Sequence, residues 1–270
     1  MKTLYVTDLD GTLLGSDIRT SDYTNQVIND LLEKGIIFSY ATARSIYTAS
    51  KVTRGMNTKY PVILHNGTLI CDNETGDVLV KNVFGSEVAD LLQDLIDHEI
   101  YPIVYSFIDG KERFSYLPEK ATRVMRDFLD TRKNDVRDRP VSSEKELFDG
   151  EIFYITCMDD PEKLTPMSEK YADTFRCLMH LEMYSGTLWL EFMPKNAFKS
   201  NALRQLKEML GCDKVVVFGD GKNDIDMFEA ADEAYAVSNA VEALKEVATE
   251  VIGSNNENAV AKWLLEHARF

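Results

Sequence analysis

A chain of 270 residues is long enough to bury a full hydrophobic core, and its formal charge of −15 argues against a nucleic-acid surface, which needs a basic face. The acidic balance still permits an anionic small substrate, because a few local cations can dominate one cleft. The four cysteines form no CxxC pair, and no apolar stretch approaches the roughly 20 residues of a membrane span. We therefore expect a cytoplasmic protein with reduced thiols, no signal peptide, no membrane partner, and a monomeric or weakly homo-oligomeric state.

The first third of the chain alternates strand and helix patterns. Apolar, β-rich runs at 4–7, 36–42 and 61–67 predict three strands. An amphipathic helix over 20–35, with a Ser/Thr start and a glycine stop, and a second helix around 45–54 separate them. This β-α-β-α-β order predicts a parallel sheet with right-handed crossovers. A hairpin around 73–76 follows.

The pattern changes near residue 84, where hairpins become mixed with helices. Such a mixture is typical of an α+β unit with an antiparallel sheet. The expected helices cover 86–98, 119–132 and 161–173, and the expected strands cover 101–107, 113–117, 151–158, 175–184 and 187–193.

The alternation of strand and helix patterns, which is typical of a parallel sheet, returns after residue 195. Helices at 197–210, from about 223, before 250 and at 257–267 alternate with strands at 214–220, 233–239 and 250–253. The sequence therefore predicts an α/β fold, in which a Rossmann-like parallel-sheet core receives an inserted α+β domain. We assign 1–83 and 188–270 to the core and 84–187 to the insertion.

Chemistry-bearing residues gather where strands of the core end. Asp8 and Asp10 follow the first strand, Thr42 follows the second, a lysine-bearing segment precedes the 197–210 helix, and GDGKNDIDM occupies 219–227. We expect these four segments at the carboxyl ends of parallel strands, which is where ligands bind in open α/β sheets. Clustered carboxylates suit Mg²⁺, and a hydroxyl and a lysine suit a phosphate group. The pattern favours phosphoryl transfer, with an aspartate as nucleophile.

Four motifs together resemble the haloacid dehalogenase (HAD) superfamily of phosphatases. DLDGTLL is similar to the family's first motif, SYATAR to its second, FMPKNAFKSNAL to its third and GDGKNDIDMF to its fourth. The segments HNGTLI and AVSNA resemble the Cof-type subclass, which carries an α/β cap between the second and third motifs. The predicted insertion lies in that position.

The resemblance implies a role for each matching residue and Mg²⁺ as the cofactor. Asp8 would be the nucleophile and a metal ligand, and Asp10 would handle protons and give the metal its backbone carbonyl. Asp220 would complete the protein's metal contacts, with Asp224 supporting the metal shell. The phosphate would be held by Leu9, Thr42, Ala43, Lys199 and Asn223. In this scheme Asp8 attacks phosphorus, Asp10 transfers protons, and the Mg²⁺ ion reduces the electrostatic repulsion between the neighbouring carboxylates.

Several assignments remain open at this stage. Glycines are common in the third motif where this chain has Asn196 and Ser200, so Lys195 competes with Lys199, although the spacing before NAL favours Lys199. Asp224 has the alternative reading of a first-turn helix acid, and we read Arg44 as a helix-entry or salt-bridge residue.

Candidates for substrate specificity come from the inserted domain. In the 175–184 strand, Cys177 and Met179 alternate with His180, Glu182 and Tyr184. The apolar face should pack on the domain's helices, so the polar face points either at a cleft or at solvent.

The expected function is Mg²⁺-dependent hydrolysis of small phosphorylated metabolites, sugar phosphates above all, through an aspartyl-phosphate intermediate. A phosphomutase of the same superfamily is the alternative enzyme. A non-catalytic sensor of a phosphorylated ligand is the alternative outside enzymes, and the intact pair of Asp8 and Asp10 argues against it.

Overall fold

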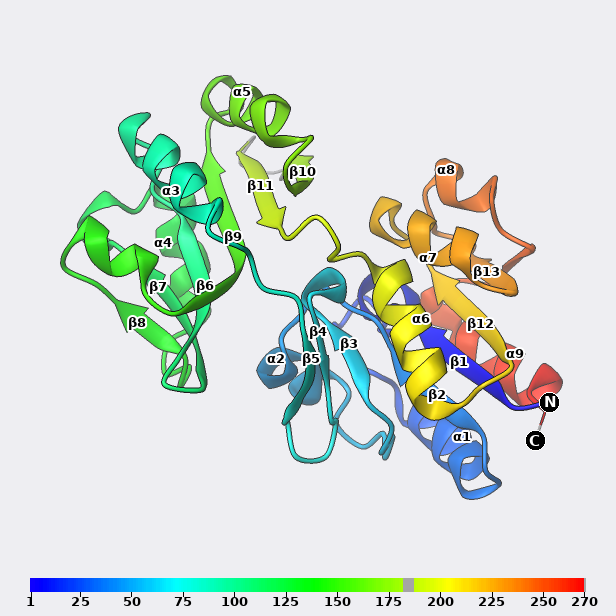
Figure 1. Ribbon diagram of the computed structural model, residues 1–270. Coiled ribbons are helices and arrows are strands. Elements are labelled where there is room, and N and C mark those ends of the chain that lie inside the picture. The colour runs from blue at the N-terminus through cyan, green and yellow to red at the C-terminus, as the bar shows by residue number, and fades with distance from the viewer. Residues whose placement is uncertain (182–186, 270) are drawn as a thin grey trace. The chain divides into compact units, whose positions relative to one another are not determined.

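The computed structural model describes residues 1–181 and 187–269, and the chain separates into two compact units (Figure 1). Unit 1 combines Met1–Lys81 with Ala197–Phe270, and unit 2 is Asn82–Asn196. No helix in the part of the chain that the structure describes is both long enough and apolar enough to cross a membrane.

Unit 1 is built on a five-stranded, all-parallel sheet in the order β14-β13-β12-β1-β2. Its strands are β1 (Thr3–Thr7), β2 (Ile37–Tyr40), β12 (Lys214–Gly219), β13 (Glu233–Val237) and β14 (Glu250–Ile252). Every residue of β1 and β2 is buried, as expected for strands covered on both faces. The predicted Rossmann-like parallel core is confirmed.

Helices cover both faces of this sheet. Figure 1 shows α6 and α7 packed together on one face and α1 and α9 on the other. The helices of unit 1 are α1 (Asp22–Glu33), α2 (Ile46–Val52), α6 (Lys199–Leu210), α7 (Ile225–Ala230), α8 (Glu242–Lys245) and α9 (Ala259–His267). The side chain of Ser21 caps α1 by accepting a hydrogen bond from the backbone N–H of Thr24 at 3.0 Å, which satisfies one free donor of the first turn.

The third predicted strand does not join the parallel sheet. Strand β3 (Val62–Leu64) pairs antiparallel with β4 (Leu69–Cys71), which pairs antiparallel with β5 (Val78–Lys81). A single parallel bridge between Ala41 and Ile63 connects this small sheet to the end of β2. The expected third parallel strand over 61–67 is therefore present only as this one bridge, because the ladder of β3 runs antiparallel to β4. Within the described residues of β3, only the Ile63 carbonyl accepts a backbone N–H, that of Thr42, from the β2 side.

Strand β3 ends early because the chain turns sharply at His65–Gly67. His65, Asn66 and Gly67 all have positive φ, at 48°, 56° and 95°. A Cβ on Gly67 would lie only 2.3 Å from the carbonyl oxygen of Phe198, so the turn needs glycine to approach the start of α6 this closely. The turn thereby brings Asn66 toward the third-motif segment.

Unit 2 has a six-stranded sheet in the order β10-β11-β9-β6-β7-β8, antiparallel except for the β7–β8 pair. Its strands are β6 (Ile103–Ile108), β7 (Lys111–Tyr116), β8 (Asp138–Pro140), β9 (Glu151–Asp159), β10 (Arg176–Leu181) and β11 (Leu188–Met193), and its helices are α3 (Val88–Asp97), α4 (Arg123–Asp130) and α5 (Pro161–Tyr171). Leu91 of α3 and Leu164 of α5 share one apolar cluster with the sheet, and Met125 of α4 belongs to another.

The boundary between the units differs from the one we expected. Strand β11 was placed in the second core segment, which was expected to begin at residue 188. It pairs instead with β9 and β10 in the sheet of unit 2, and unit 1 resumes only at Ala197. The pattern of apolar residues along a strand does not identify its pairing partner, so the sequence did not place this boundary.

Candidate active site

The first-motif loop begins at the carboxyl end of β1. The backbone N–H of Asp8 still bonds to the carbonyl of Phe218 on β12 at 2.8 Å, which fixes Asp8 at the sheet edge. A tight turn over Leu9–Leu13 follows, and its Gly11 has a φ of 78°. A Cβ on Gly11 would lie 2.3 Å from an Asp220 carboxylate oxygen, so this glycine allows the first and fourth motifs to approach each other.

Three carboxylates meet at this edge. Ligand atoms of Asp8, Asp220 and Asp224 all lie within 4.8 Å of one another. Asp220 follows β12 directly, and its Oδ1 accepts a hydrogen bond from the Thr12 hydroxyl at 2.9 Å. Asp224 is fully buried, and its Oδ2 accepts the backbone N–H groups of Asp220 and Gly221 at 3.1 and 3.0 Å. Asp224 therefore also shapes the fourth-motif turn.

Lys199 is the buried cation beside this cluster. Its side chain is fully buried, and its Nζ donates to Oδ1 of Asp8 and Oδ1 of Asp224, each at 2.6 Å. Lys195 donates instead to the backbone carbonyls of Ala172 and Asp173 in unit 2. Of the two lysines left open by the sequence, Lys199 is the one that contacts Asp8.

The position of Lys199 differs from our expectation in one respect. The segment before it does not end a strand of the parallel sheet, because β11 belongs to unit 2. Lys199 is instead the first residue of α6. A helix start disfavours a cation, so the two carboxylates offset both this effect and the desolvation of the ammonium group.

Burial changes the proton affinities of the cluster. It raises the pKa of Asp8 well above its usual value, and the charge of Lys199 offsets part of that rise. Burial also raises the pKa of Asp220 to about 6, with the Thr12 hydroxyl acting in the opposite direction. Burial alone would lower the pKa of Lys199, but the Asp224 and Asp8 carboxylates raise it above its usual value. In the absence of a metal, Asp8 and Asp220 therefore hold a proton more tightly than exposed carboxyl groups do.

The charge of the ionised cluster suits a divalent cation. With Asp8, Asp220 and Asp224 ionised and Lys199 protonated, the group carries two net negative charges among hard oxygen donors. Hard oxygen ligands in small number are what Mg²⁺ takes in proteins. The donor set therefore fits the cofactor expected from the sequence.

The second motif approaches the same edge from β2. Thr42 is buried, its backbone N–H donates to the carbonyl of Ile63 at 2.9 Å, and its Oγ1 accepts the backbone N–H of Arg44 at 3.2 Å. Ala43 is exposed and is not among the described residues with positive φ, so its alanine side chain is compatible with this backbone. Leu9, the other expected backbone donor, is fully buried directly after Asp8.

Asn223 is held by a residue that the sequence analysis did not single out. Its Nδ2 donates to Oδ1 of Asn66 at 3.2 Å, and Asn66 is completely buried with a φ of 56°. An asparagine in the left-handed region immediately before a glycine is a readable turn signal. The HNG segment therefore supports the fourth motif.

Asp10 lies outside the group of three carboxylates. Its side chain is 51% exposed and forms a two-pronged ion pair with Arg44, from Nε to Oδ2 at 2.7 Å and from Nη2 to Oδ1 at 2.5 Å. The reading of Arg44 as a salt-bridge residue agrees with this geometry, but the sequence did not show that its partner is Asp10.

The specificity candidates fall partly outside the described residues. Glu182 and Tyr184 are outside the residues that the structure describes, so their roles stay predictions. His180 is exposed on β10 and stacks on the ring of Trp189 in β11 at a centroid distance of 5.6 Å. On the expected apolar face, Cys177 packs against the larger cluster of unit 2, but Met179 is 43% exposed, so that face is only partly covered.

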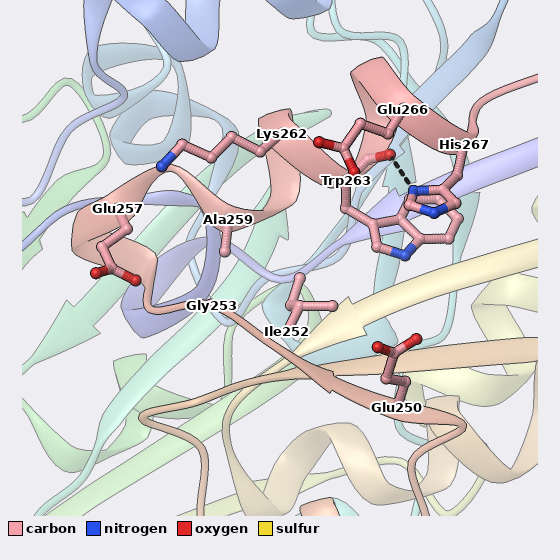
Figure 2. Close-up of a pocket in the computed structure, with 9 residues that line it drawn as sticks. All are labelled: Glu250, Ile252, Gly253, Glu257, Ala259, Lys262, Trp263, Glu266 and His267. Carbon is pink, nitrogen blue, oxygen red and sulfur yellow. Dashed lines mark hydrogen bonds between the residues drawn. The ribbon is translucent and has the colours of Figure 1, made fainter.

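A separate pocket of about 260 Å³ lies between β14 and α9 (Figure 2). Ile252, Ala259 and Trp263 contribute apolar lining, with glutamates, Lys262 and His267 around them. Trp263 stacks on His267 and also packs edge-on against Phe218 of β12. No site residue expected from the sequence lines this pocket, so it is distinct from the carboxylate cluster.

Comparisons with known proteins agree with the motifs. The model of the haloacid dehalogenase-like hydrolases matches residues 5–264. A putative phosphatase of Streptococcus pyogenes serotype M6 is 28% identical, covering 97% of this chain and 98% of its own. The 5-amino-6-(5-phospho-D-ribitylamino)uracil phosphatase YwtE of Bacillus subtilis is 28% identical, covering 95% of both chains.

A solved structure gives the same result for the fold. The protein TM0651 from Thermotoga maritima superimposes with a TM-score of 0.80 at 28% identity, covering 100% of this chain and 98% of that one. The family match spans nearly the whole chain and includes all four motifs. The resemblance seen in the sequence is thereby confirmed: this chain belongs to the haloacid dehalogenase-like hydrolase family.

Proposed function

We propose that this hydrolase is a Mg²⁺-dependent phosphatase that forms an aspartyl phosphate on Asp8. The observation that carries the proposal is the buried Asp8 carboxylate, which contacts Lys199 at 2.6 Å and lies within 4.8 Å of ligand atoms of Asp220 and Asp224. A carboxylate placed beside a buried cation and two further acids can act as a nucleophile toward a phosphate group.

The metal would be held by the side chains of Asp8 and Asp220 and by the backbone carbonyl of Asp10. Asp224 would support them, since its carboxylate already receives Lys199 and two backbone N–H groups. When bound, Mg²⁺ would neutralise the carboxylates and the developing charge on phosphorus-bound oxygens.

The reaction would proceed in two displacements. First, an Asp8 oxygen attacks phosphorus, the ester P–O bond breaks, and Asp10 gives its proton to the leaving alkoxide. Second, the Asp10 carboxylate takes a proton from water as the water oxygen attacks phosphorus. The P–O bond to Asp8 then breaks, which releases inorganic phosphate and restores the Asp8 carboxylate and the protonated Asp10.

The remaining site residues would orient the phosphate. The Thr42 hydroxyl accepts from the N–H of Arg44 and keeps its own proton for a phosphate oxygen. The backbone N–H groups of Leu9 and Ala43 would add donors, and Lys199 a positive charge. Asn223, held by Asn66, would reach the phosphate from the fourth motif.

We place the substrate among small phosphorylated metabolites, with sugar and polyol phosphates first. The name of YwtE, a phosphatase of a phosphoribitylamino compound, supports a primary phosphate ester on a polyol chain. We assign the role of substrate-selecting cap to unit 2, which interrupts unit 1 between the second and third motifs. The four free cysteines support a cytoplasmic location.

The test is a screen of phosphorylated metabolites for released phosphate, with wild-type protein and Asp8→Asn side by side. The panel should include hexose 1- and 6-phosphates, 5-amino-6-(5-phospho-D-ribitylamino)uracil and an aryl phosphate. Phosphate release that requires Mg²⁺ and Asp8 supports the proposal. Conversion of hexose 1-phosphate to its isomer would support a mutase instead, and binding without turnover of any ester would support a sensor.

A further inference from the structure

Asp10 is held by one side chain among the residues that the structure describes. Its carboxylate is about half exposed, and Arg44 grips both of its oxygens, from Nε at 2.7 Å and Nη2 at 2.5 Å. This parallel arrangement fixes the plane of a carboxylate, which a single point charge does not. Asp10 stands in the turn that follows β1, directly before Gly11, with an extended backbone (φ −70°, ψ 121°).

Arg44 is itself anchored to the phosphate-binding side of the site. Its backbone N–H donates to Oγ1 of Thr42 at 3.2 Å, and its carbonyl accepts the N–H of His65 at 3.1 Å. Its side chain is only 23% exposed, against 51% for Asp10. Arg44 therefore connects the more exposed carboxylate of the first motif to the loop that carries Thr42.

We propose that Arg44 is a positioning residue that sets the carboxylate of Asp10 relative to the phosphate held by Thr42. This inference rests on the proposed phosphatase function and adds a residue to it. Proton transfer requires a heavy-atom approach of about 2.6–3.2 Å. With Asp10 protonated, one carboxyl oxygen would stay on Arg44 and the other would carry the proton toward the leaving group. A misplacement of about 1 Å can cost about 100-fold in rate, so a half-exposed acid needs such a support.

The competing role for Arg44 is a direct contact with the substrate. Arginine commonly binds phosphate in a two-pronged manner, but the Nε and Nη2 groups that would do so here face Asp10. A substrate contact would affect KM with every ester. A support for Asp10 would affect the chemical step, and most strongly when the leaving group needs a proton.

The test compares Arg44→Met and Arg44→Lys with wild type in single-turnover formation of the phosphoenzyme. The two substrates are an alkyl phosphate, whose leaving group needs protonation, and an aryl phosphate, whose leaving group needs it much less. Arg44→Met should slow the alkyl reaction by about 10- to 100-fold and the aryl reaction by much less. Arg44→Lys should be slower than wild type but faster than Arg44→Met, because lysine restores the positive charge without the planar guanidinium group that contacts both Asp10 oxygens.

Two controls make the result specific. Arg19→Met removes an arginine from an exposed pair with Asp17 and should leave both rates unchanged. In a double-mutant cycle, Arg44→Met added to Asp10→Asn should cause little further loss, because the group that Arg44 positions has already lost its function. The Kd of Mg²⁺ should stay near the wild-type value, since the Asp10 carbonyl is unchanged.

A readout that does not depend on activity checks the pair itself. The ¹⁵N signal of the Arg44 Nε–H should show slow solvent exchange in wild type and fast exchange in Asp10→Ala. Equal rate losses with the two substrates, a rise in KM with an unchanged chemical step, or additive losses in the cycle would overturn the positioning role while leaving the phosphatase proposal intact. A wild-type protein that hydrolyses no ester in the panel would instead overturn both.

Discussion

Asp220 should reduce the stability of the metal-free protein while being required for metal binding. Burial raises its pKa to about 6 in the folded state, from an ordinary value of 3.8. Because the folded protein holds this proton more tightly than the unfolded chain, its stability falls as the pH rises from about 4 through 6. The full difference of roughly 2 units corresponds to an upper bound of about 3 kcal/mol at neutral pH.

Asp220→Asn removes this penalty and keeps an oxygen acceptor for the Thr12 hydroxyl. In EDTA at pH 7.5 we expect the free energy of unfolding to rise by as much as about 3 kcal/mol relative to wild type. At pH 4.5 the gain should fall to about 1 kcal/mol, because the folded wild type is then mostly protonated at Asp220. In Mg²⁺ the order should reverse, since ligand binding stabilises only the protein that retains the site.

The assay is urea denaturation of both proteins at the two pH values, in EDTA and in excess Mg²⁺. Asp17→Asn, at an exposed pair with Arg19, is the matched control and should change little under any condition. The explanation that burial of the ionised Asp220 destabilises the metal-free protein would be refuted by either of two results. One is an Asp220→Asn variant that is less stable than wild type in EDTA at pH 7.5, and the other is a gain in its free energy of unfolding that does not depend on pH.

Three further predictions concern the chemistry. Asp8→Asn should abolish turnover with the far-ultraviolet circular dichroism unchanged, and substantial residual activity would contradict its assignment as the nucleophile. EDTA should stop phosphate release, and added Mg²⁺ should restore it. Ca²⁺ should restore it poorly, because its larger and looser coordination shell would misplace the attacking carboxylate. Full activity in the presence of chelator would exclude a role for the metal. Lys199→Met should destabilise the protein by about 3–5 kcal/mol in EDTA, because Asp8 and Asp224 lose their buried counter-charge. An unchanged midpoint of urea denaturation would show that these two carboxylates do not need the lysine charge.

Much of this protein could be predicted from local sequence signals. Apolar periodicity indicated the order of strands and helices in both units, and the carboxylates after β1 and β12 followed from the rule that parallel strands end at one edge. The spacing of the third motif favoured Lys199 over Lys195, and the structure places Lys199 against Asp8. The positions of these residues could be predicted because each prediction depends on a short segment or on one topological rule, whereas their catalytic roles stay predictions.

Long-range pairing was decided only by the tertiary structure. Strand β3 and strand β11 read correctly as strands, yet each pairs in a different sheet from the one expected. Alternating or continuous apolar residues say which face of a strand is buried, but they do not say which neighbour supplies its hydrogen bonds. The domain boundary at residue 188 was misplaced for this reason.

The same limit applies to the side chains that support the site. Asn66 contacts Asn223 across 157 positions of sequence, and Arg44 contacts Asp10 across 34. The sequence predicted which residues would carry the chemistry, because a nucleophile, an acid and a cation are specified by residue type within a motif. The residues that orient them were decided by the folded chain, because a two-pronged ion pair or a left-handed turn acquires its partner only when distant loops meet.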